Sequence, residues 1–267
     1  MSATVAIARR ELMSYVLSPV GAVVTALFLF FTGLVYFVAA PLLLGSGFSP
    51  GQPATMRLFF EISVWVFFLV GPALSMRTVS DELRLGTLEM LMTAPVGETQ
   101  VIVGKFIGAL GFLLLMLAPT LVFVVALEWY GRPDYGEILS GYVGLVLVGS
   151  AFLASGILAS TLTSSQVLAY LTTIFLWLVV LLATIALPNL AALAEGVARR
   201  PDTSPIVVEL LGALETVARF LAAGSPIARM RGFILGLMDS FGIVYFVSFT
   251  IVFLVAAIRS LGLRRWP

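Results

Sequence analysis

Long apolar segments alternate with short polar ones along the chain, and six of the apolar segments are long enough to cross a membrane. A helix rises about 1.5 Å per residue, so about 20 residues are needed to cross about 30 Å of hydrocarbon. The six segments cover residues 20–44, 58–76, 101–127, 139–162, 167–187 and 240–258. The pattern predicts an all-α integral membrane protein, with six transmembrane helices in a single domain over residues 1–267.

A further helix is predicted before the first span, in residues 1–19. Its apolar face would carry Val5, Ala8, Leu12, Tyr15 and Val16. Its other face is largely polar, with Arg9, Arg10, Glu11 and Ser14. A helix of this kind lies in the membrane interface. The following apolar run is too long for the core of a secretory signal, so we expect it to be retained as a span.

Residues 188–239, between the last two spans, contain two signals for a helix start. Ser204-Pro205 and Ser225-Pro226 each put a capping residue before a proline, which favours the first helical position. Neither helix would be long enough to cross the membrane. We expect external helices or a re-entrant pair, and an amphipathic surface pair that only caps the bundle is the alternative.

The most polar segment between spans is the loop of residues 77–100. Thr78 and Asp81 have the spacing of a capping box, so a helix is predicted to start there and to end before Pro95 and Gly97. Its apolar stripe would be Leu85, Leu88 and Met92. Such a short amphipathic helix either docks into a groove on a soluble partner or lies on the lipid headgroups.

Composition excludes several classes of function. Hydrophobic residues make up 60% of the chain and charged residues 11%, against about 45–50% and about 25% in soluble proteins. The sequence contains no histidine and no cysteine, which removes the usual ligands of zinc, haem and copper and any imidazole or thiolate catalyst. The formal charge of +1 gives no electrostatic footprint for nucleic acid.

Basic residues in the short loops predict the orientation. With the N-terminus in the cytoplasm, the two short external loops hold only Arg57 and Arg132. The cytoplasmic side then holds Arg9, Arg10, Arg77, Arg84, Lys105, Arg259, Arg264 and Arg265. Positive residues favour the cytoplasmic side, and long loops count for less, so both termini are predicted to be cytoplasmic.

Several positions within the spans favour close packing. Gly104 and Gly108 form a pair of small residues one turn apart, as in close helix contacts. Ser150 with Ala154 and Ser155 with Ala159 give the fourth span similar small faces, for packing within the chain or for a dimer seam. Gly71-Pro72 and Pro119 would kink the second and third spans, either for packing or to shape a substrate path.

The chain offers no chemistry for nucleotide hydrolysis or for a proton relay. The glycines before Lys105 lack the spacing of a phosphate-binding loop, and Phe106 stands where that loop needs serine or threonine. The acidic residues closest to the spans are Glu61, Glu128 and Asp239, all near predicted ends. Interfacial positions suit them better than a proton relay.

Residues of the polar loop resemble the signature of the ABC type-2 permease family. The residues that carry the resemblance are Glu82, Arg84, Leu85, Gly86, Thr87, Leu88, Glu89 and Pro95. It continues with Gly104-Lys105 and with the N-terminal Arg9-Arg10-Glu11-Leu12, Tyr15 and Ser18-Pro19, which look like the family's elbow helix. Residues near the end are similar to the gliding-motility branch: Arg231-Gly232, Asp239, Tyr245-Phe246 and Arg264-Arg265-Trp266. A His-Phe pair associated with that branch is absent.

The resemblance implies a permease subunit of an ATP-binding-cassette transporter, in which residues 78–95 form the coupling helix that seats on the ATPase. Those eight loop residues are then the candidate coupling site. ATP and Mg²⁺ would bind to the separate ATPase subunit, and the chain would have no cofactor of its own. Partners would be that ATPase, a second copy or a related permease, the lipid bilayer and an accessory envelope protein.

Two other functions remain open from the residues themselves. An ATP-independent secondary transporter or channel would carry charged residues near mid-membrane. A scaffold that anchors an envelope or motility machine would need no polar path through the bundle. The substrate and the direction of transport are not encoded in any motif, although an exporter is the expectation from the resemblance.

Overall fold

The computed structural model describes residues 2–44, 55–87, 97–129, 132–198 and 226–263, together with 209, 210, 212, 213 and 216. Within these residues the regular structure is helical throughout, and six helices are long and apolar enough to cross a membrane. The prediction of an all-α membrane protein with six spans is therefore confirmed.

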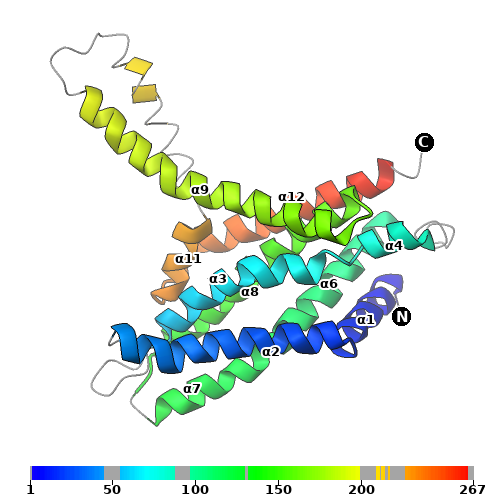
Figure 1. The fold of residues 1–267 in the computed structure, drawn as a ribbon, viewed down its shortest axis with the longest axis horizontal. Helices are drawn as coiled ribbons and strands as arrows, with labels where there is room; N and C mark the ends of the chain where they lie inside the picture. Colours follow the sequence, from blue (N-terminus) through cyan, green and yellow to red (C-terminus); the bar gives the residue numbers. More distant parts are fainter. Residues whose placement is uncertain are drawn as a thin grey trace.

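Figure 1 shows the helices as one elongated bundle, with both chain ends at the same end as α4. The first three spans are α2 (Pro19–Leu34) with the π-helical η1 (Val35–Leu44), α3 (Arg57–Ser75), and α6 (Glu98–Leu117) with η2 (Ala118–Thr120) and α7 (Leu121–Glu128). The last three are α8 (Tyr135–Leu162), α9 (Gln166–Ala198) and α12 (Ser240–Leu263). Three shorter helices accompany them: α1 (Ala3–Val16), α4 (Ser80–Leu85) and α11 (Pro226–Ile234).

Helix α8 lies at the centre of the bundle, where it packs against α3, α6, α9, α11 and α12. Its small residues allow this: a Cβ on Gly149 would lie 2.4 Å from a methyl of Leu113, and one on Gly156 would lie 1.8 Å from Ser75 Oγ. The pairs of small residues noted in the sequence of this span also allow close packing. Ser150, Ala154, Ser155 and Ala159 are all buried within this one chain, so they serve packing within the chain.

The N-terminal helix α1 packs along α6. Its inward side is formed by Ile7, Ala8, Leu12 and Tyr15. Two details of the predicted apolar face are wrong, because Val5 and Val16 are exposed and Glu11, assigned to the polar face, is partly buried. At the turn into α2, Ser18 Oγ accepts a hydrogen bond from the N–H of Val20, and Pro19 occupies the first turn.

Three of the prolines within the spans leave the helices continuous or separated by one short turn. Pro72 lies inside α3, which continues to Ser75, and the neighbouring Gly71 approaches Phe152 so closely that a Cβ would lie 2.6 Å from the Phe152 Cβ. Pro119 lies in the short 3₁₀ turn that separates α6 from α7. Pro188 lies within α9, which runs on to Ala198 instead of ending at 187.

The second start signal before the last span is confirmed. Helix α11 starts at Pro226 and ends at Ile234, and Gly236 then adopts a left-handed φ of +82°. The start at Ser204-Pro205 lies outside the described residues.

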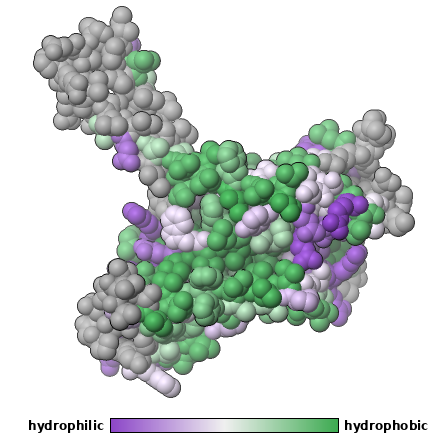
Figure 2. Space-filling view, in the orientation of Figure 1, coloured by the Kyte–Doolittle hydropathy of each residue, from purple (hydrophilic) through white to green (hydrophobic). Residues whose placement is uncertain are grey.

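The surface is that of a lipid-embedded bundle. Large apolar side chains of α2, α9 and α12 are exposed, among them Phe30, Phe175 and Phe241. In Figure 2 apolar residues cover the middle of the bundle, and polar residues gather at the end that carries α1 and α4. Exposed aromatic and aliphatic side chains on several neighbouring helices are costly in water and favourable in lipid.

Candidate coupling site

The predicted single helix from Thr78 to before Pro95 is wrong, because α4 ends at Leu85 and Gly86 forms a turn before Thr87. At its C-terminus Gly86 has a φ of +68°, the left-handed conformation that favours glycine. At its N-terminus the backbone N–H groups of Val79 and Ser80 both donate to Ser160 Oγ of α8, at 2.9 and 2.8 Å. Ser160 is fully buried, so a side chain from 80 residues away caps this helix.

The predicted capping box is therefore wrong. Thr78 is not the N-cap residue of α4, because that position is taken by Val79. The Thr78 hydroxyl donates instead to the carbonyl oxygen of Ser75 at 2.7 Å, at the end of α3. The spacing of Thr78 and Asp81 matches the motif, but the tertiary contact with Ser160 supplies the acceptor that a capping residue would have offered.

We expect Ser160→Ala to detach the N-terminus of α4 from α8. Two buried N–H groups would lose their acceptor, which costs about 1–3 kcal/mol for an unsatisfied buried donor. Thermal unfolding of the purified protein in detergent measures the loss. Ser164→Ala, which changes an exposed serine one turn further along, is the control. Equal melting temperatures for the two variants would contradict a capping role.

Lys105 lies at the centre of the contacts beneath α4. It is 2% exposed, and its Nζ lies 2.8 Å from Glu82 Oε1 of α4 and 3.7 Å from Glu11 Oε2 of α1. The same ammonium donates to the carbonyl oxygen of Thr78. A single cation on α6 thus joins α1, α4 and the turn that follows α3. We call Lys105, Glu82, Glu11 and Ser160 the anchor cluster.

The electrostatics of the anchor cluster are unbalanced. One cation faces two carboxylates, and Glu82 Oε2 is buried with no hydrogen-bond partner among the described residues. Burial raises the pKa of the Glu11 carboxyl above its usual value, and the nearby Lys105 only partly opposes this. The ion pair with Glu82 is shorter, so we infer that Glu82 is the main partner of Lys105 and Glu11 the weaker one.

Two glycines let α1 approach α6 closely enough for this contact. A Cβ on Gly104 would lie 2.9 Å from Ile7 Cβ, and one on Gly108 would lie 2.8 Å from the carbonyl oxygen of Ala8. The close helix approach predicted from the pair is therefore confirmed, with α1 as the partner. The two close contacts with α1 thus lie directly before Lys105 and three residues after it.

Helix α4 also contacts α9. Gln166 Nε2 donates to Asp81 Oδ1, and Asp81 Oδ2 lies 3.8 Å from Arg77 Nε. The apolar Leu83 packs with Val79, Ile157 and Ala257 in a small core at this end of the bundle. The inward side of α4 is thereby linked to α6, α8 and α9, and through its core to α12.

The outward side of α4 is free of the bundle. Arg84, Gly86 and Thr87 are exposed, and Leu85 is 67% exposed. Of the five candidate residues that the structure describes, Glu82 alone points into the anchor cluster. Leu88, Glu89 and Pro95 lie outside the described residues.

Lys105 and Glu11 were named from the sequence but were not predicted to belong to one site, and Ser160 was not singled out. A signal for Lys105 existed, since it is the only charged residue in the predicted span 101–127. A charge in an apolar segment needs a partner. No comparable signal existed for Ser160, one of several small polar residues in its span.

A second ion pair, between a half-exposed arginine and a buried glutamate, lies at the opposite end of α3. Arg57 contacts Glu137 Oε2 through Nη2 at 2.9 Å and Nε at 3.0 Å, and the Glu137 side chain is 7% exposed. Glu137 was missed because the predicted fourth span began at 139, two residues after Glu137. Both residues lie in the first turn of their helices, so this pair sits at a bundle end and joins α3 to α8.

The described residues contain no group of three carboxylate, histidine or cysteine side chains that could hold a metal ion. The anchor cluster combines buried charges, a side-chain cap and close helix contacts that position one short helix at an end of the bundle. With the six apolar helices, these features define a multi-pass membrane protein.

Comparison with known families identifies the chain more closely. The model of the family described as ABC-2 family transporter protein matches residues 5–264, so the chain belongs to this family. No curated protein matches the sequence. The chain is thus the permease component of an ABC transporter. Permeases of this family are membrane transport components that normally work with an ATPase subunit.

Proposed function

We propose that this permease takes its energy from a separate ATPase subunit, which docks on the exposed side of α4. The observation that carries the proposal is the division of α4 into two sides. Its inner side is held by Lys105, Ser160 and Gln166 of three different helices. Its outer side exposes an arginine and a leucine at the most polar end of the bundle.

Such an arrangement suits force transmission. A load applied to α4 reaches α8 through the hydrogen bond to Ser160 at 2.8 Å and α6 through the ion pair with Lys105 at 2.8 Å. Lys105 passes it on to α1, because its Nζ also lies 3.7 Å from Glu11 Oε2. Buried charges in low dielectric resist separation more strongly than surface pairs do. ATP-driven closure of the partner would then move the cytoplasmic ends of these helices together.

The anchor cluster divides the candidate coupling residues into two groups. Glu82 holds α4 to the permease, and Arg84, Leu85, Gly86 and Thr87 face the ATPase. Leucine fills an apolar groove on the partner, and arginine fixes the register through its charge. Leu88, Glu89 and Pro95 are proposed to extend the same contact.

Leu85→Asp combined with Arg84→Glu should abolish binding of the ATPase while leaving the permease folded. The change removes an apolar anchor and reverses a charge on a side that makes no described contact with the bundle, so we expect at least a tenfold loss of affinity, about 1.4 kcal/mol. Affinity is measured by titrating purified ATPase onto the permease in nanodiscs.

The control for this test is Arg9→Glu with Arg10→Glu, which reverses two exposed charges on α1. Unchanged affinity in the control and loss in the α4 variant support the proposal. Equal affinity of the α4 variant and the unaltered protein would overturn it, and transport that survives ATP depletion would favour the ATP-independent transporter.

The remaining parts of the proposal concern the assembly. With α4 in the cytoplasm, both chain ends are cytoplasmic, since all three lie at one end of the bundle. A second permease copy, or a related permease, would cover part of the exposed apolar surface of α2, α9 or α12. Export is the proposed direction. An accessory envelope protein and membership of the gliding-motility branch rest on sequence resemblance alone.

A further inference from the structure

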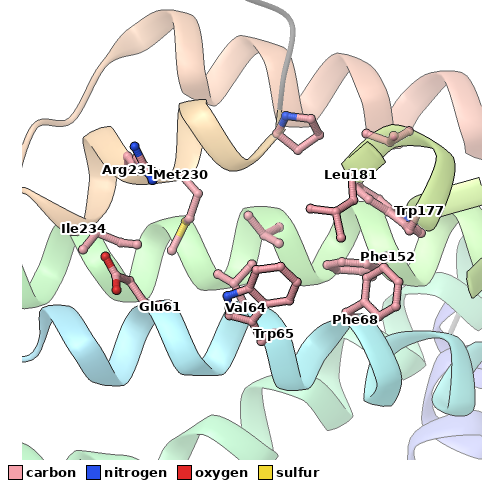
Figure 3. A pocket seen from close by; sticks show the side chains of 13 residues that line it. Glu61, Val64, Trp65, Phe68, Phe152, Trp177, Leu181, Met230, Arg231 and Ile234 are labelled. Atoms are coloured by element: carbon pink, nitrogen blue, oxygen red, sulfur yellow. The ribbon is translucent and has the colours of Figure 1, made fainter. Parts of the chain in front are cut away.

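A cavity of about 180 Å³ lies between α3, α8, α9 and α11, on the half of the bundle remote from α4. Figure 3 shows its two ends. Glu61 and Arg231 stand at one end, and Phe68, Phe152 and Trp177 stand at the other. The middle is apolar, with Val64, Trp65 and Met230. Neither the anchor cluster nor the proposed ATPase contact uses any of these residues.

The polar end lies close to the end of the span. Glu61 is one turn from Arg57, where α3 begins. Phe68 follows seven residues later, which is about 10 Å further along the helix and towards the membrane interior. The cavity therefore runs from the interface into the hydrocarbon region, with charged groups at the interface and aromatic groups at depth.

The charged groups at the polar end have no partner of their own. Among the described residues, neither Glu61 nor Arg231 forms an ion pair or a side-chain hydrogen bond, and both are exposed. The neighbouring Arg229 lies 3.7 Å from Asp239. A carboxylate and a guanidinium are thus both available at the mouth of the cavity.

The aromatic end is rigid. Trp177 is 5% exposed, its ring centroid lies 4.1 Å from that of Phe152, and its Nε1 donates to Ser155 Oγ at 2.9 Å. A fixed aromatic wall suits a hydrocarbon chain, which gains from burial against it without the need for a polar contact.

The cavity is thus charged at the end near the interface and aromatic at the end inside the membrane. We therefore propose that it binds a zwitterionic amphiphile, a lipid whose headgroup carries both an ammonium and a phosphate. Glu61 accepts hydrogen bonds from the ammonium, and Arg231 contacts the phosphate, whose geometry suits a guanidinium. The acyl chain enters between Trp65 and Phe68 and ends at Trp177. The proposal goes beyond the ATPase contact, since it concerns a ligand and holds whether or not α4 docks a partner.

The test uses Trp177 as the reporter. The chain has four tryptophans, so a background with Trp65→Phe, Trp129→Phe and Trp266→Phe leaves Trp177 alone. The protein is placed in nanodiscs of phosphatidylglycerol, and phosphatidylethanolamine with brominated acyl chains is added in steps. Bromine quenches tryptophan fluorescence on contact. We expect quenching to saturate at a low mole fraction of the zwitterionic lipid.

Variants and a matched lipid decide the outcome. Glu61→Gln and Arg231→Gln, each in the same background, should raise the mole fraction of zwitterionic lipid at which quenching saturates by about tenfold or more. Glu128→Gln, an acidic residue near the end of α7, should leave it unchanged. Phosphatidylglycerol with the same brominated chains should quench only in proportion to its abundance, because its headgroup has no ammonium for Glu61.

Two results would overturn the proposal. Equal quenching by the two lipids, unaffected by the variants, would mean ordinary contact with bulk lipid. Absence of quenching, together with disulfide formation between copies carrying Trp65→Cys, would mean that a second copy covers the cavity. The chain has no other cysteine, so such a disulfide has one interpretation. ATPase binding is measured separately, so the failure of either proposal leaves the other testable.

Discussion

Replacing Lys105 with methionine is expected to destabilise the permease by about 3–5 kcal/mol, the usual cost of removing one partner from a buried ion pair. Glu82 and Glu11 would be left facing each other with no cation between them, and the carbonyl oxygen of Thr78 would lose its donor. Thermal unfolding in detergent measures the effect. Lys105→Arg keeps the positive charge, so we expect it to lose much less stability.

A triple variant separates stability from energy coupling. Lys105→Met with Glu82→Gln and Glu11→Gln replaces all three charges by neutral groups of similar size, an exchange that is often neutral for stability. We expect the melting temperature to recover and the transport-linked ATPase activity to stay low, because α4 is no longer held by charge. Full activity in the triple variant would show that the ion pairs serve folding only.

Gly21→Ala is expected to displace α1 from the rest of the bundle. A Cβ at Gly21 would lie 2.0 Å from the carbonyl oxygen of Tyr15 and 2.9 Å from its carbon. Both atoms are backbone, so no side-chain rotation can relieve the overlap, and the turn between α1 and α2 must open. Hydrogen exchange of the backbone amides in residues 3–16 should be at least tenfold faster, corresponding to about 1.4 kcal/mol.

Gly33→Ala on the same helix is the matched control. Its nearest neighbour would be Phe123 Cζ at 3.6 Å, an ordinary contact. Alanine is favoured over glycine within a helix by up to about 1 kcal/mol, so exchange in α1 should stay unchanged and stability should not fall. Faster exchange of α1 in both variants would attribute the effect to α2 in general and not to the turn.

The sequence was sufficient for the spans and for the close packing at Gly104 and Gly108. The length of an apolar segment indicates whether it can cross the membrane, and small residues one turn apart indicate where two helices can pack closely. The sequence was insufficient where a residue far away in the chain caps a helix in place of a neighbouring residue. Ser160 caps α4 in place of Thr78, and no local pattern in residues 77–100 could reveal an acceptor in α8.

The faces of α1 were misassigned for a different reason. At a membrane interface an apolar side chain that faces lipid is as well placed as one that faces protein, so hydrophobicity alone does not tell which side packs on α6. Val5 and Val16 accordingly lie on the exposed side, and Glu11 turns inward because Lys105 provides its charge partner. The fifth span was predicted to end at 187, but α9 continues through Pro188 to Ala198, since a proline removes one N–H and need not end a long helix.

Under the proposed function, the link between α1 and α4 through Lys105 would give the bilayer itself a part in the working cycle. Helix α1 is the piece of the protein expected to rest at the level of the lipid headgroups, and it shares one buried cation with the helix proposed to receive the ATPase stroke. Headgroup packing and bilayer thickness would then set the mechanical reference against which each stroke is delivered, so turnover should vary with the membrane even when the nucleotide and both subunits are unchanged.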